Sequence, residues 1–314
     1  MPSLEIRPPL AAIVGPTAVG KTGLAIELAE RLGGEIVSAD SRLFYRGLDI
    51  GTAKPSLAER QRVPHHLIDV ANPDEVWSLA TFQEKARLVI EQIHARGRLP
   101  FLVGGTGQYL RAVTQGWQAP QVEPDVRLRQ ALEAWSDQIG PLGLHARLAV
   151  IDTQAAQQID WRNLRRSVRA LEVIFTTGRR FSEQRRQSDS PYRLLTLGLT
   201  RPRPELFERI DARVDAMIVA GLVDEVRCLL AQGYAPELPA FSAIGYREII
   251  AHLQGKSSLA EAVQEIKRDT RIFVRRQANW FKPSDPAIRW FSAAPDTLEQ
   301  MEQAINAFLH QTSD

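Results

Sequence analysis

The chain has 314 residues, of which 44% are hydrophobic, and its formal net charge is +2. Its single cysteine, Cys228, excludes a disulfide framework or a cysteine-based zinc finger within one chain. No window approaches the roughly 18 apolar residues of a membrane-spanning helix. We therefore expect a cytoplasmic protein with an ample core and no membrane contact.

The first 110 residues alternate short apolar runs with helical patterns. Strands are predicted at AAIVG, EIVSADS, HHLIDV and LPFLVGGTG. One helix is predicted to end near Leu32, and another to run from about Ser78 to Arg96. Strands that alternate with helices predict a parallel sheet flanked by helices, which is an α/β fold. The polar ends of these strands, at residues 15–22, 38–41 and 104–107, are then expected to meet at one edge of the sheet.

The segment GPTAVGKT fits the phosphate-loop pattern G-x-x-x-x-G-K-[ST]. A predicted strand precedes it and a predicted helix follows it, which is the context that the motif requires. We expect its residues to bind phosphate groups: Gly15, Pro16, Thr17, Ala18, Val19, Gly20, Lys21 and Thr22. The sheet is therefore predicted to be of the P-loop NTPase-like type.

Helical patterns without a convincing strand dominate residues 126–188. A strand then returns at YRLLTLGLT, and long helices are predicted near residues 204–232 and 259–281. We expect an inserted all-helical domain at residues 120–189, within a catalytic core made of residues 1–119 and 190–314.

The positive charge is uneven along the chain. Residues 161–193 contain nine arginines and three acidic residues, and residues 264–282 contain six basic residues and two acidic ones. Basic helical surfaces are typical of proteins that bind nucleic acid, although such a stretch is often only a solvated helix face. Two of them beside a phosphate loop favour a nucleic-acid partner.

A kinase or NTPase usually has an acidic residue at the end of a neighbouring strand, where it helps to hold Mg²⁺. The strand PFLV ends without one, and Asp69 is followed by no switch-like segment. Asp40 and Thr106 are instead predicted to face the loop. A carboxylate beside a bound phosphate suits the removal of a proton from a nucleophile.

Six motifs in this order resemble the tRNA dimethylallyltransferase family: GPTAVGKT, SADSRLFYRGLDIGTAKP, PHHLIDV, LVGGTGQYL, RRSVRALEV and AIGYREI. TRIFVRRQANWF fits as well, and the resemblance spans about residues 10–282. It implies transfer of a dimethylallyl group from dimethylallyl diphosphate to N6 of the adenosine 3′ of the tRNA anticodon, at position 37. The loop would then hold the diphosphate leaving group and not a nucleotide.

The resemblance also implies roles for individual residues. Asp40 would be the catalytic base, Thr106 would contact the substrate at the reaction centre, and Arg213 would contact the diphosphate. Thr22 would bind Mg²⁺, the expected cofactor. Without the resemblance, Asp40 is interpreted as a helix or turn cap, Thr106 as a turn hydroxyl and Arg213 as a surface arginine in an ion pair.

Further residues are implied to bind tRNA by the same resemblance. They are Asp40, Ser41, Arg42, Leu43, Thr106, Arg127, Arg165, Arg166, Ser167, Val168, Arg169, Ser242, Ala243, Ile244, Gly245, Tyr246, Arg247, Thr270, Arg271, Arg275, Arg276 and Gln277. Many members have Gln at the position of Leu43, and Gln and Lys are frequent at those of Ile272 and Arg275. A polar contact to a base at Leu43 is therefore not expected.

Three alternatives remain open at this stage: an adenylate isopentenyltransferase, a phosphate-loop kinase or NTPase, and a non-catalytic RNA-binding protein. The helical insertion and its arginines argue against the first, and the missing acid argues against the second. We expect a monomer. The stripe Val263, Ile266, Thr270, Phe273, Gln277 and Trp280 is predicted to face the core.

Overall fold

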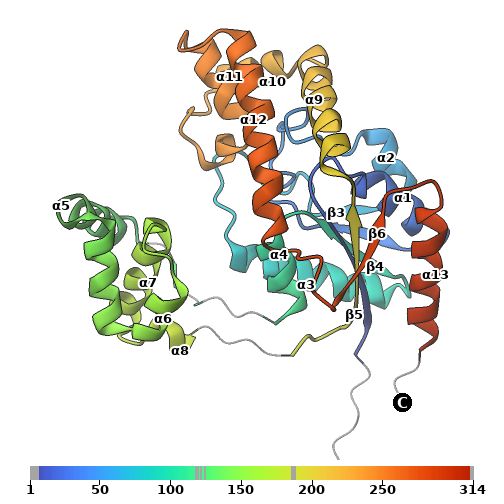
Figure 1. Ribbon diagram of the computed structural model, residues 1–314, viewed down its shortest axis with the longest axis horizontal. Helices are drawn as coiled ribbons and strands as arrows, with labels where there is room; N and C mark the ends of the chain where they lie inside the picture. The colour runs from blue at the N-terminus through green and yellow to red at the C-terminus, as the bar shows by residue number, and fades with distance from the viewer. Residues whose placement is uncertain (1–6, 117–119, 121, 124, 185–188, 312–314) are drawn as a thin grey trace, which may run out of the picture. The chain divides into compact units, whose positions relative to one another are not determined.

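A computed structural model describes residues 7–116, 120, 122–123, 125–184 and 189–311 (Figure 1). The chain divides into two compact units. The core unit comprises residues 1–114 and 190–314, and the helical insertion comprises residues 115–189. Arg185 and Arg186, which belong to the arginine-rich stretch at residues 161–193, lie outside the described residues.

The core unit contains a parallel sheet with the strand order β3-β2-β4-β1-β5-β6. The strands are β1 (Pro9–Val14), β2 (Glu35–Ser38), β3 (His65–His66), β4 (Pro100–Gly104), β5 (Arg193–Thr200) and β6 (Ile288–Ser292). The predicted fold class is therefore confirmed. The sequence did not predict β6, which pairs with β5 at the edge of the sheet.

Helices cover both faces of this sheet (Figure 1). They are α1 (Lys21–Arg31), α2 (Leu57–Arg62), α3 (Leu79–Ala95), α4 (Gly107–Thr114), α9 (Arg203–Val219), α10 (Leu222–Ala231), η1 (Pro239–Ser242), α11 (Tyr246–Leu253), α12 (Leu259–Ala278) and α13 (Thr297–His310). Side chains of β1 alternate between two buried clusters: Ala11 and Ile13 face one, and Leu10, Ala12 and Val14 face the other. This alternation is the period of two expected for a strand that is buried on both faces.

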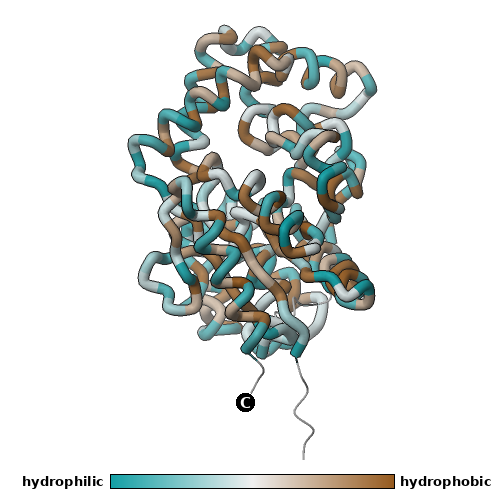
Figure 2. The backbone as a smooth tube through the Cα atoms, turned by 90° about the vertical axis from the view of Figure 1, so that its right-hand side faces the viewer, coloured by the Kyte–Doolittle hydropathy of each residue, from teal (hydrophilic) through white to brown (hydrophobic). Residues whose placement is uncertain are grey.

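The helices are amphipathic, so hydrophobic and hydrophilic segments alternate along them (Figure 2). Helix α12 begins with a capping box between Ser258 and Glu261. Its predicted core stripe is wrong at Phe273, whose exposed fraction is 37%, while the neighbouring Val274 is buried. Helix α12 packs through Ile266, Val274 and Gln277, so its buried face includes Val274 instead of Phe273.

The helical insertion has a hydrophobic core of its own. Its helices are α5 (Val126–Ile151), α6 (Thr153–Gln158), α7 (Leu164–Thr177) and α8 (Phe181–Gln184). Helix α5 is interrupted at Gly140, where φ is 76° and the next residue is Pro141. This break gives α5 two segments that pack beside α7 and α6.

A buried carboxylate orders the basic residues of the insertion. Glu172 on α7 is fully buried and accepts hydrogen bonds from Arg169 (2.6 Å), Arg129 (2.9 Å) and the Asp125 N–H (2.8 Å). Burial opposes its ionisation, but these bonds outweigh that effect and lower the pKa of Glu172. Within the described residues, no helix in either unit is long and apolar enough to cross a membrane.

Candidate active site

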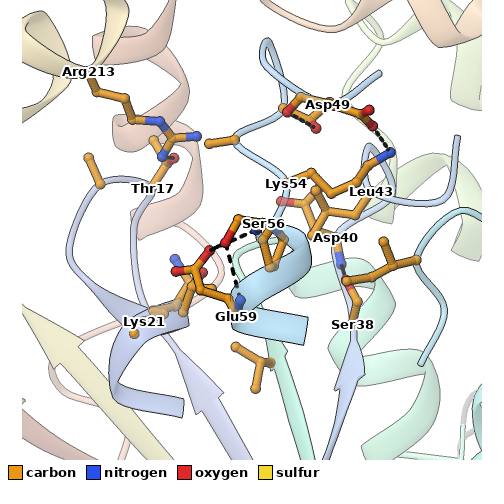
Figure 3. A pocket seen from close by; sticks show the side chains of 18 of the residues that line it. Thr17, Lys21, Ser38, Asp40, Leu43, Asp49, Lys54, Ser56, Glu59 and Arg213 are labelled. Atoms are coloured by element: carbon orange, nitrogen blue, oxygen red, sulfur yellow. Dashed lines mark hydrogen bonds and ion pairs between the residues drawn. The ribbon is translucent and has the colours of Figure 1, made fainter. Parts of the chain in front are cut away.

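A cavity of about 920 Å³ lies in the core unit, beyond the carboxyl ends of β1, β2 and β4 (Figure 3). Its walls are the phosphate loop, Asp40, the loop at residues 49–56, helix α2 and one side of α9. This is the position in which ligands bind to parallel sheets. Figure 3 shows Lys21, Arg213 and Asp40 arranged around the same space.

The phosphate loop requires glycine at its first position. Gly15 has a φ of 145°, and a Cβ there would lie 2.4 Å from the carbonyl oxygen of Leu199. Gly20 has a φ of 111° and is the residue from which α1 begins. In the described part of the chain, the amides of Ala18, Val19 and Gly20 have no hydrogen-bond partner. These amides and the N-terminus of α1 form an anion-binding site.

Three cationic side chains bind the carbonyl oxygens of the loop. Lys21 Nζ donates to Pro16 O (2.7 Å), Arg209 Nε to Ala18 O (2.9 Å) and Arg201 Nε to Val19 O (3.0 Å). The sequence analysis missed Arg201 and Arg209. Arg209 is four residues before Arg213 on α9, so helical spacing places both on one face, and that spacing was the available signal.

Two of the predicted phosphate ligands, Lys21 and Arg213, are partly buried cations. Burial lowers the pKa of Lys21 to about 8, with Asp40 opposing and Arg213 adding to the shift. Burial also lowers the pKa of Arg213, and Asp40 again opposes it. Arg213 Nη1 donates to Thr17 Oγ1 (3.3 Å). An anion bound to the loop would act as a counter-charge for both side chains.

Asp40 lies two residues after the end of β2 and lines the cavity. Its Oδ1 accepts a hydrogen bond from the Arg42 N–H (3.0 Å), so the turn-capping role is present. Its other oxygen has no hydrogen-bond partner among the described residues, which leaves it able to accept a proton or a hydrogen bond from a ligand. The capping and the functional interpretations are therefore compatible.

Asp69, the other acidic candidate, is committed to ion pairs. Its carboxylate contacts Lys54 Nζ (2.5 Å) and Arg60 Nη1 (2.7 Å). Lys54, whose side chain is 2% exposed, also binds Asp49 (2.5 Å) and the Tyr45 carbonyl oxygen (2.8 Å). These bonds fix one wall of the cavity, and they leave Asp69 poorly suited to hold Mg²⁺ as in a kinase.

Thr106 begins α4: its carbonyl oxygen accepts hydrogen bonds from the N–H groups of Tyr109 (3.0 Å) and Leu110 (3.2 Å). Gly104 and Gly105 line the cavity, but Thr106 is not among the lining residues. Its loop adjoins the Asp40 segment, because a Cβ on Gly104 would lie 2.7 Å from Ala39 O. Thr106 is thus near Asp40 in the fold but outside the cavity wall.

Residues 40–43 divide between the cavity and the outer surface. Leu43 lines the cavity together with Asp40. Arg42 binds Pro239 O (3.1 Å) and Ser242 Oγ (3.1 Å), which joins this segment to the predicted 242–247 segment. Ser41 is partly buried. The structure therefore brings together the 40–43 and 242–247 segments, both of which are predicted to bind tRNA.

Several residues of the predicted tRNA set are exposed: Arg127, Arg165, Arg166, Ser242, Arg247, Arg275 and Arg276. Others are partly buried: Arg169, Ile244, Thr270 and Arg271. Five side chains of the predicted set are buried, namely Ser167, Val168, Ala243, Tyr246 and Gln277. Gly245, which is also buried, precedes α11. Packing against helix neighbours withdraws these residues from solvent, as no motif match can show.

The ion pairs of α9 and α12 further sort the basic residues. Arg271 pairs with Asp211, and Lys267 with Asp215 (2.6 Å), so two cations of α12 are neutralised by α9. Arg275 and Arg276 lie beyond these pairs. Helix α9 thus faces the phosphate loop with Arg209 and Arg213 and faces α12 with acidic residues.

Glu225 on α10 is a further residue that the sequence analysis missed. Its carboxylate accepts hydrogen bonds from the N–H groups of Asp49 (3.1 Å), Ile50 (2.7 Å) and Gly51 (3.3 Å), and from Tyr246 Oη (2.5 Å). Burial raises the pKa of Tyr246, and Glu225 adds to the shift. Tyr246 therefore supports the cavity wall through Glu225. No motif indicated this pairing.

The sheet, the loop and the cavity define an α/β protein of the phosphate-loop class. A family model described as IPP transferase matches residues 43–284, and one described as isopentenyl transferase matches residues 8–73. A tRNA dimethylallyltransferase of Roseiflexus sp. (strain RS-1) is 53% identical over 301 residues, covering 96% of this chain and 99% of that protein. One of Thermomicrobium roseum is 50% identical over 309 residues, covering 98% and 94%.

Solved structures agree with these relatives. A full-length tRNA isopentenylpyrophosphate transferase from Bacillus halodurans is 42% identical, with a TM-score of 0.73 and 97% of both chains covered. A eukaryotic dimethylallyltransferase described as acting on tRNA is 27% identical, with a TM-score of 0.83, covering 98% of this chain and 80% of that one. The chain belongs to the tRNA dimethylallyltransferase family, a class of prenyltransferases, which confirms the predicted resemblance.

Proposed function

We propose that this protein transfers a dimethylallyl group from dimethylallyl diphosphate to N6 of the adenosine at position 37 of tRNA and releases diphosphate. One observation carries the proposal: a single cavity holds an anion-binding loop and a carboxylate with a free oxygen. The first suits the leaving group and the second suits the attacking amine. The family relatives support the same reaction.

The phosphate loop would stabilise the diphosphate as the bond between carbon and oxygen breaks. The amides of Ala18, Val19 and Gly20 and the start of α1 present partial positive charge to it. Lys21 would exchange its bond to Pro16 O for a diphosphate oxygen, and Arg213 would bind another. Because both cations are partly withdrawn from solvent, their interaction with the leaving group would be stronger than that of fully exposed side chains.

Asp40 would orient N6 of the adenine and accept its proton. The N6 lone pair is delocalised into the ring, so the amine is a poor nucleophile until the proton is drawn away. The bond from the Arg42 N–H to Oδ1 fixes the carboxylate, and the second oxygen would face the amine. Thr106 would hold the substrate from the adjoining loop.

The site is compatible with Mg²⁺ through few protein ligands. Thr22 lies in the cavity wall on the first turn of α1, and no group of three or more His, Cys, Asp or Glu side chains able to hold a metal occurs among the described residues. Mg²⁺ commonly keeps several waters and uses one or two protein ligands with phosphate oxygens. Thr22 would bind the ion, which would neutralise charge on the diphosphate.

The tRNA partner would present its anticodon loop with the target base extruded. Unpaired RNA loops are recognised by stacking and hydrogen bonding of splayed bases. The exposed arginines of the insertion, Arg127, Arg165 and Arg166, and those of α12, Arg275 and Arg276, would contact the phosphate backbone. We propose that the protein acts as a monomer in the cytoplasm, where tRNA is available.

The test is transfer to an anticodon stem-loop RNA in buffer that contains Mg²⁺ and dimethylallyl diphosphate but no nucleotide. We expect a mass increase of one dimethylallyl group on the single adenosine 3′ of the anticodon. An RNA with that adenosine replaced by guanosine is the control and should gain no mass.

Two results would contradict the proposal. One is an absolute requirement for ATP, and the other is brisk ATP hydrolysis in the absence of the prenyl donor. Either would return the protein to the kinase and NTPase class. Prenylation of free AMP with no reaction on RNA would favour an adenylate isopentenyltransferase.

A further inference from the structure

Gln277, at the C-terminal end of α12, connects two loops of the core unit that are far apart in sequence. Its Oε1 accepts a hydrogen bond from the Thr17 N–H (2.9 Å), and its Nε2 donates one to Gly105 O (3.0 Å). The side chain is 5% exposed. Its carboxamide is therefore bonded at both ends inside the protein and is not part of an RNA-facing surface.

The end of α12 packs directly on the glycine-rich loop that follows β4. A Cβ on Gly105 would lie 2.2 Å from Gln277 Nε2, and a Cβ on Gly107 would lie 2.4 Å from the Trp280 side chain. Neither distance is possible without movement. The two glycines thus let α12 approach this loop closely enough for the Gln277 bonds to form.

The chemistry of the two contacts requires a carboxamide. Thr17 presents an N–H and needs an acceptor, while Gly105 presents a carbonyl oxygen and needs a donor. A carboxylate offers only acceptors, and an apolar side chain offers neither. Thr17 also accepts a hydrogen bond from Arg213 through its hydroxyl, and Gly105 directly precedes Thr106. Gln277 therefore joins the segment for the leaving group to the segment beside the acceptor.

We propose that Gln277 is a positioning residue that fixes the position of the phosphate loop relative to the 104–107 loop. Through these two bonds, α12 would order the donor site. The inference rests on the proposed function for the meaning of the two segments. It adds a role that RNA contact alone would not give. Arg275 and Arg276, two residues and one residue earlier, are exposed on the same helix end.

The first test compares Gln277→Ala with Gln264→Ala, which removes an exposed carboxamide from the same helix. We expect Gln277→Ala to lower kcat/KM for dimethylallyl diphosphate by about 10- to 100-fold, because small displacements of reacting groups are costly. Its affinity for the stem-loop RNA should change less than about threefold. The control variant should match the wild type. A folded Gln277→Ala protein within twofold of the wild type in kcat/KM overturns the proposal.

Inorganic diphosphate is the second probe, titrated calorimetrically into the RNA-free protein. Gln277→Ala should bind it about tenfold more weakly than the wild type, since Thr17 is released. This measurement separates the two proposals. If the wild type binds diphosphate but prenylates no RNA, the proposed function fails while this inference is still decided by the affinity ratio.

The Gln277→Glu variant tests positioning apart from stability. Below the pKa of the introduced carboxyl group, its neutral form again offers one donor and one acceptor, so kcat/KM relative to the wild type should rise as pH falls. A purely structural role would change the melting temperature but leave that ratio constant. A ratio that stays constant across the titration of the introduced carboxyl group, followed by its own NMR or infrared signal, overturns the proposal, and it does so even if Gln277→Ala fails to fold.

Discussion

The positive charges around the phosphate loop and those that begin α7 are held in different ways. Lys21, Arg209 and Arg213 each have a defined hydrogen-bond partner in the loop. Arg165 and Arg166 are exposed, and neither has an ion pair in the described part of the chain. A small leaving group requires charges that are fixed before it arrives, whereas a polyanion is attracted by charges that remain mobile and solvated.

The largest effect is expected at Asp40, which lines the same cavity as the fixed cations of the phosphate loop. Asp40→Asn keeps an acceptor for the Arg42 N–H, so the turn should survive, but the proton acceptor is lost. We expect single-turnover prenyl transfer to slow by about 10² to 10⁴, as for other positioned bases. Affinity for the stem-loop RNA should change little. A variant with a near-normal rate would remove Asp40 from the role of base.

In the insertion, a fixed set of charges surrounds Glu172. Glu172→Gln should destabilise this unit by about 1–3 kcal/mol, because two partly exposed arginines lose their buried partner. Hydrogen exchange of α5 and α7 in the full chain measures the effect, with α1 as internal reference. Since the pKa of Glu172 is lowered on folding, its stabilisation is present above about pH 4.3 and is lost at lower pH. Unchanged exchange in α5 and α7 would show that the ion pairs are dispensable.

The fixed charge of Lys21 makes donor binding sensitive to pH. With a pKa of about 8, Lys21 is mostly protonated at pH 7 and mostly neutral at pH 9. Affinity for dimethylallyl diphosphate should therefore fall about tenfold over this range. Lys21→Met should bind more weakly at pH 7 and should lose this part of the pH dependence. Equal pH profiles for the two proteins would exclude Lys21 as the cause.

The exposed charges of Arg165 and Arg166 are tested by replacing both residues with alanine. Arg169 is left in place, because it is bonded to Glu172. The slope of log affinity for tRNA against log salt concentration should become less steep by about 1.4 to 1.8, one increment for each lost phosphate contact. Affinity at physiological salt should fall several-fold, and donor binding should not change. An unaltered slope would show that this face is only a solvated helix surface.

Sequence patterns predicted the sheet and the phosphate loop because both depend on local chemistry. A short continuous apolar run marks β1, which is buried on both faces, and the glycines of GPTAVGKT are dictated by backbone geometry at Gly15 and Gly20. Strand β6 was missed because IRWFS is short and four of its five residues, including Arg289 and Trp290, are only half-buried or exposed. The part of the candidate site that was predicted is the part formed by strand ends, namely the phosphate loop, Asp40 and the glycines after β4.

Contacts between distant segments could not be predicted from local patterns. Arg201 and Arg209 reach the phosphate loop across more than 180 residues, and Glu225 reaches residues 49–51 across more than 170. Such pairings depend on tertiary packing, for which neither periodicity nor spacing provides a signal. The same limitation explains Gln277: its motif suggested RNA contact, but packing on Gly105 placed it in the interior.

The two sides of α9 have a consequence for how the protein distinguishes two phosphate-rich substrates. On one side, Arg209 and Arg213 face the loop, and on the other, Asp211 and Asp215 neutralise Arg271 and Lys267. On the α12 side, Arg271 and Lys267 are already paired with carboxylates and are therefore weaker binding groups for a diphosphate. On the loop side, Arg209 and Arg213 are already oriented toward the phosphate loop by their bonds to Ala18 O and Thr17 Oγ1. Under the proposed function, this division of charge along α9 would reduce competition between the donor and the tRNA for the same cations.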